Sequence, residues 1–315
     1  MKLVTFILKE EKRLGLWQDG RIIVISQAAR LMGLGAEKPS SPAAAGAGYS
    51  PGVPPDCLES MEALLAAGEA GRHLVERIAA SPPQEAAVPA EEVQLAAPLT
   101  RPPKIICIGM NYRSHCAEQG ARLPSHPIIF AKFATAVTGP GSPVIRPRLT
   151  QQLDYETELA VVIGRRGKNI GQNKAMEYVA GYTIFNDVSA RDIQFGDRQW
   201  VRGKTFDTFA PMGPWLVTAD EIPDPQDLRL RCWVNGELRQ DSTTAEMIFT
   251  VPYLIEFLSR VVTLEPGDII ATGTPAGVGA FRQPPVYLEA GDRIRMEITG
   301  LGVLENYIVD AEYDN

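Results

Sequence analysis

The chain has 315 residues, of which 45% are hydrophobic, and a formal net charge of −7. This length and hydrophobic content allow a folded core of one large domain or two. The acidic balance, with no Lys/Arg cluster, argues against nucleic acid as a partner, and no apolar run approaches the roughly 20 residues of a membrane-spanning helix.

The first elements along the chain indicate β-structure followed by a helix. Residues 2–8 and 21–26 are apolar and rich in β-branched side chains, and Asp19-Gly20 between them is typical of a hairpin turn. Residues 57–80 show the helical spacing of Leu, Met and Val. Together these segments predict a small α+β unit at the N-terminus.

Two Pro-containing segments interrupt this unit. Residues 36–55 are rich in Ala, Gly, Pro and Ser and predict a loose loop, while residues 81–92 indicate a linker punctuated by proline. We therefore expect a boundary near residue 95, with a small N-terminal α+β domain and its linker at 1–95 and a larger domain at 96–315.

After this boundary the sequence pattern changes to short apolar runs separated by Gly, Pro and Asp. Helical spacing is confined to residues 174–181 and 250–262, and neither a G-x-G-x-x-G turn nor a P-loop is present. Many short strands with few helices favour an α+β, β-rich sandwich, roll or barrel. The predicted strands are 104–109, 127–133, 158–164, 181–187, 230–238, 267–273 and 292–298.

The cysteine and histidine content limits which cell compartment and which metal ions are expected for this protein. The four cysteines are scattered, which predicts free thiols in a reducing compartment: the cytoplasm, or the mitochondrial matrix if a transit peptide has been removed. Only three histidines are present, which argues against a multi-histidine zinc site. Any metal would rely on oxygen ligands, as Mg²⁺, Mn²⁺ and Ca²⁺ do.

The stretch LDYETELAVVIG (153–164) places acids at every second position before an apolar run. Glu156 and Glu158 point to one face of a strand, where they repel each other unless a cation lies between them. An acidic strand edge facing solvent is the alternative, although the buried continuation weakens it. Asp187, after the run YTIF, is either a turn aspartate or a third ligand for Mg²⁺. Asp154 shares the same parity and is interpreted as a supporting or surface acid.

Three further segments carry possible chemistry. His115 and Glu118 lie one helical turn apart, either as a water-activating dyad or as a surface pair. Lys204, among small and aromatic residues, either binds a substrate oxyanion or extends to solvent. The turn after residue 271 places Thr272 and Thr274 where they could hold a carboxylate, or simply forms a tight turn.

Several stretches, in this order, resemble the fumarylacetoacetate hydrolase superfamily, over roughly residues 102–310. Within it, the chain is most similar to the domain-containing-protein-2-like group and the bacterial acylpyruvase and oxaloacetate decarboxylase proteins. The stretches are KIICIGMNYRSHCAEQG, LDYETELAVVIGRRGKNI, GYTIFNDVSARDIQ, GKTFDTFAPMGPWLV, VNGELRQDSTTAEMIF and LEPGDIIATGTPAGVG.

This resemblance implies a mixed β-roll or sandwich, α+β and β-rich, assembled as a homodimer, with Trp200, Phe206 and Phe209 as interface aromatics. One departure is Met110, where some acylpyruvases carry an arginine before NY. The resemblance also implies roles for individual positions: metal ligands Glu156, Glu158 and Asp187; catalytic residues His115, Glu118 and Lys204; and substrate-binding residues Gln194, Thr274 and Arg191.

The activity implied by the resemblance is Mg²⁺- or Mn²⁺-dependent cleavage of the C3–C4 bond of small 2-oxo or β-diketo acids, by hydrolysis of acylpyruvates or decarboxylation of oxaloacetate. Metal-dependent stabilisation of the enolate is common to these reactions. Two alternatives remain open: an oxaloacetate keto–enol tautomerase or a sugar-acid dehydratase, and a non-enzymatic binding or structural protein stabilised by a cation.

Overall fold

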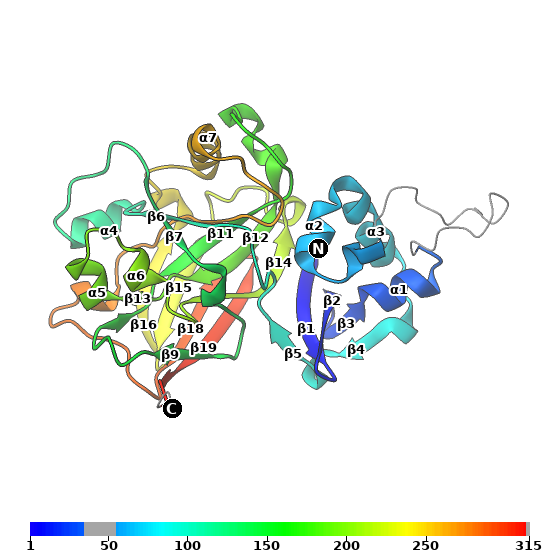
Figure 1. Cartoon of the computed structure of the whole chain (residues 1–315), viewed down its shortest axis with the longest axis horizontal. Coiled ribbons are helices and arrows are strands. Elements are labelled where there is room, and N and C mark those ends of the chain that lie inside the picture. Colours follow the sequence, from blue (N-terminus) through cyan, green and yellow to red (C-terminus); the bar gives the residue numbers. More distant parts are fainter. Residues whose placement is uncertain (35–54, 313–315) are drawn as a thin grey trace.

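The computed structural model describes residues 1–34 and 55–312, and its fold is α+β and β-rich, as predicted (Figure 1). The described strands form sheets of 12, five and two strands. Apart from Pro55, the loop predicted for residues 36–55 lies outside the described residues.

The N-terminal strands form a meander of β1 (Lys2–Leu8), β2 (Glu11–Gln18) and β3 (Arg21–Val24). The Asp19-Gly20 turn, with φ of 49° and 78°, joins β2 to β3. The predicted turn is correct, but it joins β3 to β2, a strand that was not predicted, and not directly to residues 2–8. The second predicted run ends as α1 (Ile25–Leu31).

The predicted helix at 57–80 is divided into α2 (Met61–Ala66) and α3 (Gly68–Ala80). Gly68 adopts a φ of +58°, which interrupts the α-helical path. The predicted linker at 81–92 was wrong in part, because it contains β4 (Ala87–Pro89), which pairs with β3. Its closing proline is tolerated because β4 is an edge strand.

The large sheet is continuous across the predicted domain boundary, because β1 pairs with β14. Strand β5 (Gln94–Ala96) also pairs with β1 at this point. The boundary near residue 95 stays a prediction. The sheet order is β4-β3-β2-β1-β14-β12-β11-β17-β6-β7, with β8 also on β14. Its remaining strands are β6 (Ile105–Gly109), β7 (Ile128–Lys132), β8 (Val137–Thr138), β11 (Thr157–Ile163), β12 (Val179–Asn186), β14 (Ala210–Thr218) and β17 (Ile269–Ala271).

A second sheet has the order β16-β15-β18-β19-β9. The run predicted as a single strand at 230–238 was wrong in part, because Asn235 and Gly236, with φ of 52° and 82°, form a turn that joins β15 to β16. Alternate residues of β15 and β18 are buried, so one face of this sheet packs on the core. Its strands are β9 (Pro143–Arg146), β15 (Arg229–Val234), β16 (Glu237–Thr243), β18 (Arg293–Ile298) and β19 (Gly302–Asp310).

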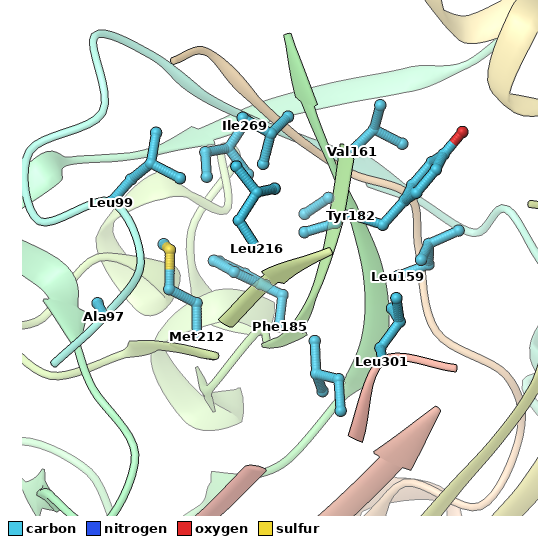
Figure 2. Packing of buried hydrophobic residues seen from close by; sticks show 14 of the residues in the cluster. Ala97, Leu99, Leu159, Val161, Tyr182, Phe185, Met212, Leu216, Ile269 and Leu301 are labelled. Atoms are coloured by element: carbon cyan, nitrogen blue, oxygen red, sulfur yellow. The ribbon is translucent and has the colours of Figure 1, made fainter. Parts of the chain in front are cut away.

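The hydrophobic core joins both sheets. Figure 2 shows Phe185 of β12 and Leu216 of β14 among the buried side chains that fill it, together with Leu301 from the β18–β19 turn. Strand β11 is buried along its whole length, as a central strand covered on both faces should be. This rigid strand is the one that the acidic stretch enters.

Four helices follow the boundary: α4 (Arg113–Glu118), α5 (Arg191–Gly196), α6 (Val201–Lys204) and α7 (Val251–Val261). The predicted helix at 250–262 was correct, whereas residues 172–178 form a 3₁₀ helix leading into β12. Helices α4, α5 and α6 gather near β6 and β7, at the end of the molecule away from the N-terminal elements (Figure 1).

Two expectations from composition can be compared with the described residues. All four cysteines are buried and none is in a disulfide. Within residues 1–34 and 55–312, no helix has the length and hydrophobicity that crossing a bilayer demands.

Candidate metal centre and active site

The acidic stretch at 153–164 places two buried carboxylates close together beside the large sheet. Glu156 and Glu158 are 5% and 1% exposed, and Asp187 at the end of β12 is fully buried. The antiparallel register places Thr157 opposite Asn186, and the Asp187 amide donates to the Glu156 carbonyl at 2.9 Å. Ligand oxygens of the three acids all lie within 4.8 Å of one another.

The alternation is therefore not a solvent-facing strand edge, and Asp187 is not an isolated turn residue. Oxygen donors at this separation, on a rigid pair of strands, suit a hard divalent cation such as Mg²⁺ or Mn²⁺. The structure brings together the three residues that were predicted as metal ligands.

Two buried lysines pair with this cluster. Lys204 Nζ lies 2.8 Å from Glu156 Oε2 and 2.9 Å from Asp187 Oδ2. Lys132 of β7 pairs with the other oxygen of Asp187 and donates to the Val188 carbonyl at 2.9 Å. Lys132 was not predicted as a site residue. Its signal in the sequence is a lysine within the apolar run PIIFAKF, where a solvated side chain would be out of place.

The protonation tendencies of the two glutamates differ in direction. Burial favours the neutral form of Glu156, but Lys204 and Arg191 outweigh it and hold its pKa below the usual range. Burial, reinforced by the carboxylates of Asp187 and Glu156, raises the pKa of Glu158 well above its usual range. Of the two glutamates, Glu158 is therefore the one whose ionised form is disfavoured, and a divalent cation beside it would stabilise that form.

Arg191, at the start of α5, connects the cluster to its surroundings. Its Nε lies 2.8 Å from Asp154 Oδ2, and its Nη1 lies 2.7 Å from Glu156 Oε1 and 3.0 Å from Gln194 Oε1. Burial alone would lower the pKa of Arg191, but Asp154 and Glu156 raise it, so the guanidinium stays charged. Asp154 is fully buried, which excludes the expected surface position.

The His115–Glu118 pair forms on α4 as predicted, with Nδ1 of the imidazole 2.6 Å from Oε1 of the carboxylate. The second oxygen of Glu118 accepts the Gly277 amide at 2.8 Å, which fixes the carboxylate from the opposite side. His115 is 6% exposed and meets the Phe281 ring edge-on at 6.0 Å. A surface ion pair is therefore excluded.

One narrow cavity, about 50 Å³ in volume, contacts Glu156 and Glu158 of the acidic cluster and His115 of the dyad. Its wall includes four aromatic side chains, of which Trp200 packs edge-on against Phe130 at 5.4 Å. The lining residues are Ile108, Gly109, Met110, His115, Gln119, Phe130, Glu156, Glu158, Arg191, Gln194, Phe195, Trp200, Lys204, Thr274 and Phe281.

The predicted substrate contacts Gln194, Thr274 and Arg191 all line this cavity, and their roles stay predictions. The Thr274 hydroxyl donates to the Thr157 carbonyl at 3.0 Å and accepts from Gln240 at 2.8 Å. Gln240, which was not predicted, therefore holds the threonine turn against β11.

Of the three predicted interface aromatics, Trp200 and Phe206 are partly exposed, whereas Phe209 is not. Trp200 forms part of the cavity wall, and Phe209 is fully buried within the chain, 5.2 Å from Phe206 between ring centroids. A buried Phe209 cannot contact a second subunit without rearrangement. The homodimer itself stays a prediction.

Comparison with known proteins adds independent information. The family described as "Fumarylacetoacetate (FAA) hydrolase C-terminal" matches residues 104–309. Oxaloacetate tautomerase FAHD2B, mitochondrial, of Bos taurus is 51% identical over 257 residues, with 81% of each chain covered. Oxaloacetate tautomerase FAHD2A, mitochondrial, of Homo sapiens is 48% identical over the same length and coverage.

Solved structures agree over almost the entire chain. Fumarylacetoacetate hydrolase from Exiguobacterium antarcticum is 35% identical with a TM-score of 0.80, covering 99% of this chain and 100% of that one. Maleylpyruvate hydrolase from Sphingobium sp. SYK-6, in complex with manganese(II) and pyruvate, is 32% identical with a TM-score of 0.75 at the same coverage.

Proposed function

The chain belongs to the fumarylacetoacetate hydrolase family, and on that basis we propose that it is a divalent-metal-dependent oxaloacetate tautomerase. The observation that carries the proposal is one cavity lined by Glu156, Glu158 and His115, where both glutamates belong to a three-carboxylate cluster and the imidazole is held by Glu118. The names of the mitochondrial relatives support this choice of reaction over the cleavage reactions expected from the sequence.

Glu156, Glu158 and Asp187 are the proposed ligands of Mg²⁺ or Mn²⁺, and Ca²⁺ would accept the same oxygens. When bound, such an ion supplies a Lewis acid that polarises the 2-oxo group of a substrate. The ammonium of Lys204, already shared between Glu156 and Asp187, adds positive charge next to an oxygen that becomes negative.

Keto–enol exchange moves one proton at C3 and one at the 2-oxygen, without breaking a carbon–carbon bond. Glu118 holds Nδ1 of His115, which leaves Nε2 to carry a proton to or from C3. Arg191, Gln194 and Thr274 are the proposed contacts for substrate carboxylate and oxo oxygens. His115, Glu118 and Lys204 are the proposed catalytic residues.

Four aromatic side chains, Phe130, Phe195, Trp200 and Phe281, wall the cavity and would restrict the access of water to a bound substrate. Keto–enol exchange requires only proton transfer, whereas hydrolysis also requires an attacking water.

Hydrolysis of acylpyruvates is the second candidate function. Two observations favour it: the dyad is also an arrangement that deprotonates water, and the similar Sphingobium structure is a maleylpyruvate hydrolase. Decarboxylation of oxaloacetate and sugar-acid dehydration have no specific support. A purely structural cation site is the least favoured, because such a site needs no buried histidine with an oriented carboxylate.

We also propose a homodimer in the mitochondrial matrix or the cytoplasm. The compartment is supported by the mitochondrial designation of the relatives and by buried cysteines without disulfides.

A substrate screen with and without EDTA tests the function. We expect Mg²⁺ or Mn²⁺ to accelerate the interconversion of enol and keto oxaloacetate, followed by ultraviolet absorbance, without release of pyruvate. Acetylpyruvate and fumarylpyruvate serve as competing substrates. Faster hydrolysis of either would favour the second candidate, and activity unaffected by EDTA would contradict the metal site.

A further inference from the structure

Asp154 is the third acid of the alternating stretch, yet it stands apart from the metal-binding cluster. It lies on β10 (Leu153–Asp154), which pairs with β13 (Ser189–Ala190) immediately before α5. Its side chain is fully buried and does not belong to the three-carboxylate group. A buried carboxylate outside a metal site must have its charge satisfied by other means.

Four donors from three segments satisfy this carboxylate. Its Oδ1 accepts the amides of Tyr155 at 2.9 Å and Gly279 at 2.7 Å. Its Oδ2 accepts the Ala280 amide at 3.0 Å and Arg191 Nε at 2.8 Å. Asp154 thus joins the start of α5 to the loop that carries Phe281, the ring that packs against His115.

Arg191 is left with one free donor. Its Nε and Nη1 are bonded to Asp154, Glu156 and Gln194, whereas Nη2 is buried with no hydrogen-bond partner among the described residues. Buried donors of a charged group are normally paired, so an unpaired one points to an acceptor that binds there. Arg191 lines the cavity, where a substrate carboxylate would supply this acceptor.

We propose that Asp154 is a positioning residue that sets the plane of the Arg191 guanidinium, so that Nη2 meets a carboxylate of the substrate. Because the guanidinium is planar, contacts at Nε and Nη1 determine the direction of the remaining N–H groups. The inference rests on the proposed function, since it assumes a carboxylate substrate.

The test is a double-mutant cycle of Asp154→Asn and Arg191→Lys, measured on the Mn²⁺-loaded protein with oxaloacetate. Asp154→Asn keeps the shape of the side chain but leaves a neutral group beside Nε. We expect KM to rise about tenfold or more, the size of a lost charge-assisted hydrogen bond, while kcat changes about threefold at most. Mn²⁺ affinity by calorimetry should stay close to wild type, whereas the Tm should fall, because the substitution removes the negative partner of a buried guanidinium and turns one accepting oxygen into a donor.

Arg191→Lys should raise KM similarly, because one ammonium cannot serve Asp154, Glu156 and substrate together. The double variant should then be no worse than the worse single variant. Asp192→Asn is the matched control: Asp192 follows Arg191 on α5, and its carboxylate accepts from the Thr150 hydroxyl and the Gln151 amide instead of from the Arg191 guanidinium. Its KM should stay within about twofold of wild type.

A KM unchanged by Asp154→Asn, or effects that multiply in the double variant, would overturn the proposal. If Asp154→Asn does not fold, a KM unchanged by Arg191→Lys overturns it equally. Absence of metal-dependent tautomerisation in the wild type would count instead against the proposed function, so the two failures are distinguishable.

Discussion

Glu156 and Glu158 show how two residues on one strand face meet opposite electrostatic environments. Burial opposes ionisation of both. Lys204 and Arg191 reverse that effect at Glu156 and lower its pKa, whereas Asp187 and Glu156 reinforce it at Glu158 and raise its pKa. The Gly273 amide, at 2.9 Å from Oε2, and the charge of Lys204 oppose the shift at Glu158. The environment of each carboxylate, and not its residue type, sets its charge.

The dyad makes a separate prediction at this scale. Glu118→Gln removes the carboxylate charge that orients the His115 ring, and we expect kcat to fall by about 10²–10⁴-fold. Mn²⁺ affinity by calorimetry should not change, and the free energy of unfolding should change by about 1 kcal/mol, because an amide oxygen can still accept a hydrogen bond. Retention of activity would show that the pair is not catalytic.

Among the elements, α6 has four residues and depends on neighbouring elements for its position. The ring of Trp200 at its N-cap packs against Phe130 of β7, and it lies so close to Gly109 of β6 that a Cβ there would come within 2.3 Å. Lys204 follows one turn later and reaches the carboxylates. The close approach of Trp200 to a glycine at the end of β6 therefore positions a site lysine.

Gly109→Ala tests this arrangement. The new methyl group would displace the Trp200 ring and shift α6, and we expect kcat/KM for oxaloacetate to fall about tenfold, since small misplacements of catalytic groups reduce rates strongly. Gly196→Ala is the control, because a Cβ at Gly196 meets nothing within 4 Å. If the two variants are equally active, the contact between Trp200 and Gly109 does not determine the position of α6.

At the scale of the whole molecule, the site brings together buried charged side chains from different strands of the large sheet. Lys132 lies on the edge strand β7, and Asp187 directly follows the interior strand β12. Both side chains are fully buried. Removing Lys132 would leave Asp187 with Lys204 as its remaining cationic partner, so the cost should lie below the roughly 3–5 kcal/mol of a buried charge left without any partner. The folded state and the metal centre should therefore be thermodynamically coupled.

Lys132→Met should lower the free energy of unfolding by less than about 3 kcal/mol without metal, because Lys204 still pairs with Asp187, and Mn²⁺ should stabilise this variant more than wild type. Removal of an ammonium strengthens attraction of the cation, and a ligand that binds only the folded state stabilises it. Lys104→Met is the control, because Lys104 lies 2.8 Å from the buried Asp268, outside the site. Denaturant titrations with and without Mn²⁺ measure the free energy of unfolding of each variant. If Mn²⁺ stabilises Lys132→Met and wild type equally, folding and metal binding are not coupled through Lys132.

Local patterns were sufficient for much of the fold and for the acids of the site. Alternation predicted that Glu156 and Glu158 share a face, and helical spacing predicted the His115–Glu118 contact, because both geometries follow from backbone periodicity. Asp187 was located from its place after an apolar run. The family resemblance then supplied roles for the remaining predicted residues, which periodicity does not indicate.

Contacts between segments that are distant in the sequence could not be predicted from those local patterns. Asp154 meets Arg191 across 37 positions and Lys132 meets Asp187 across 55, so nothing in either local sequence indicates the pairing. The alternating acids of residues 153–164, followed by an apolar run, predicted that carboxylates are buried at the start of a strand and that a cation balances their negative charge. Folding assigned Asp154 to an arginine and the two glutamates to a shared centre, because burial makes each charge depend on whichever partners the packed chain brings within hydrogen-bonding distance.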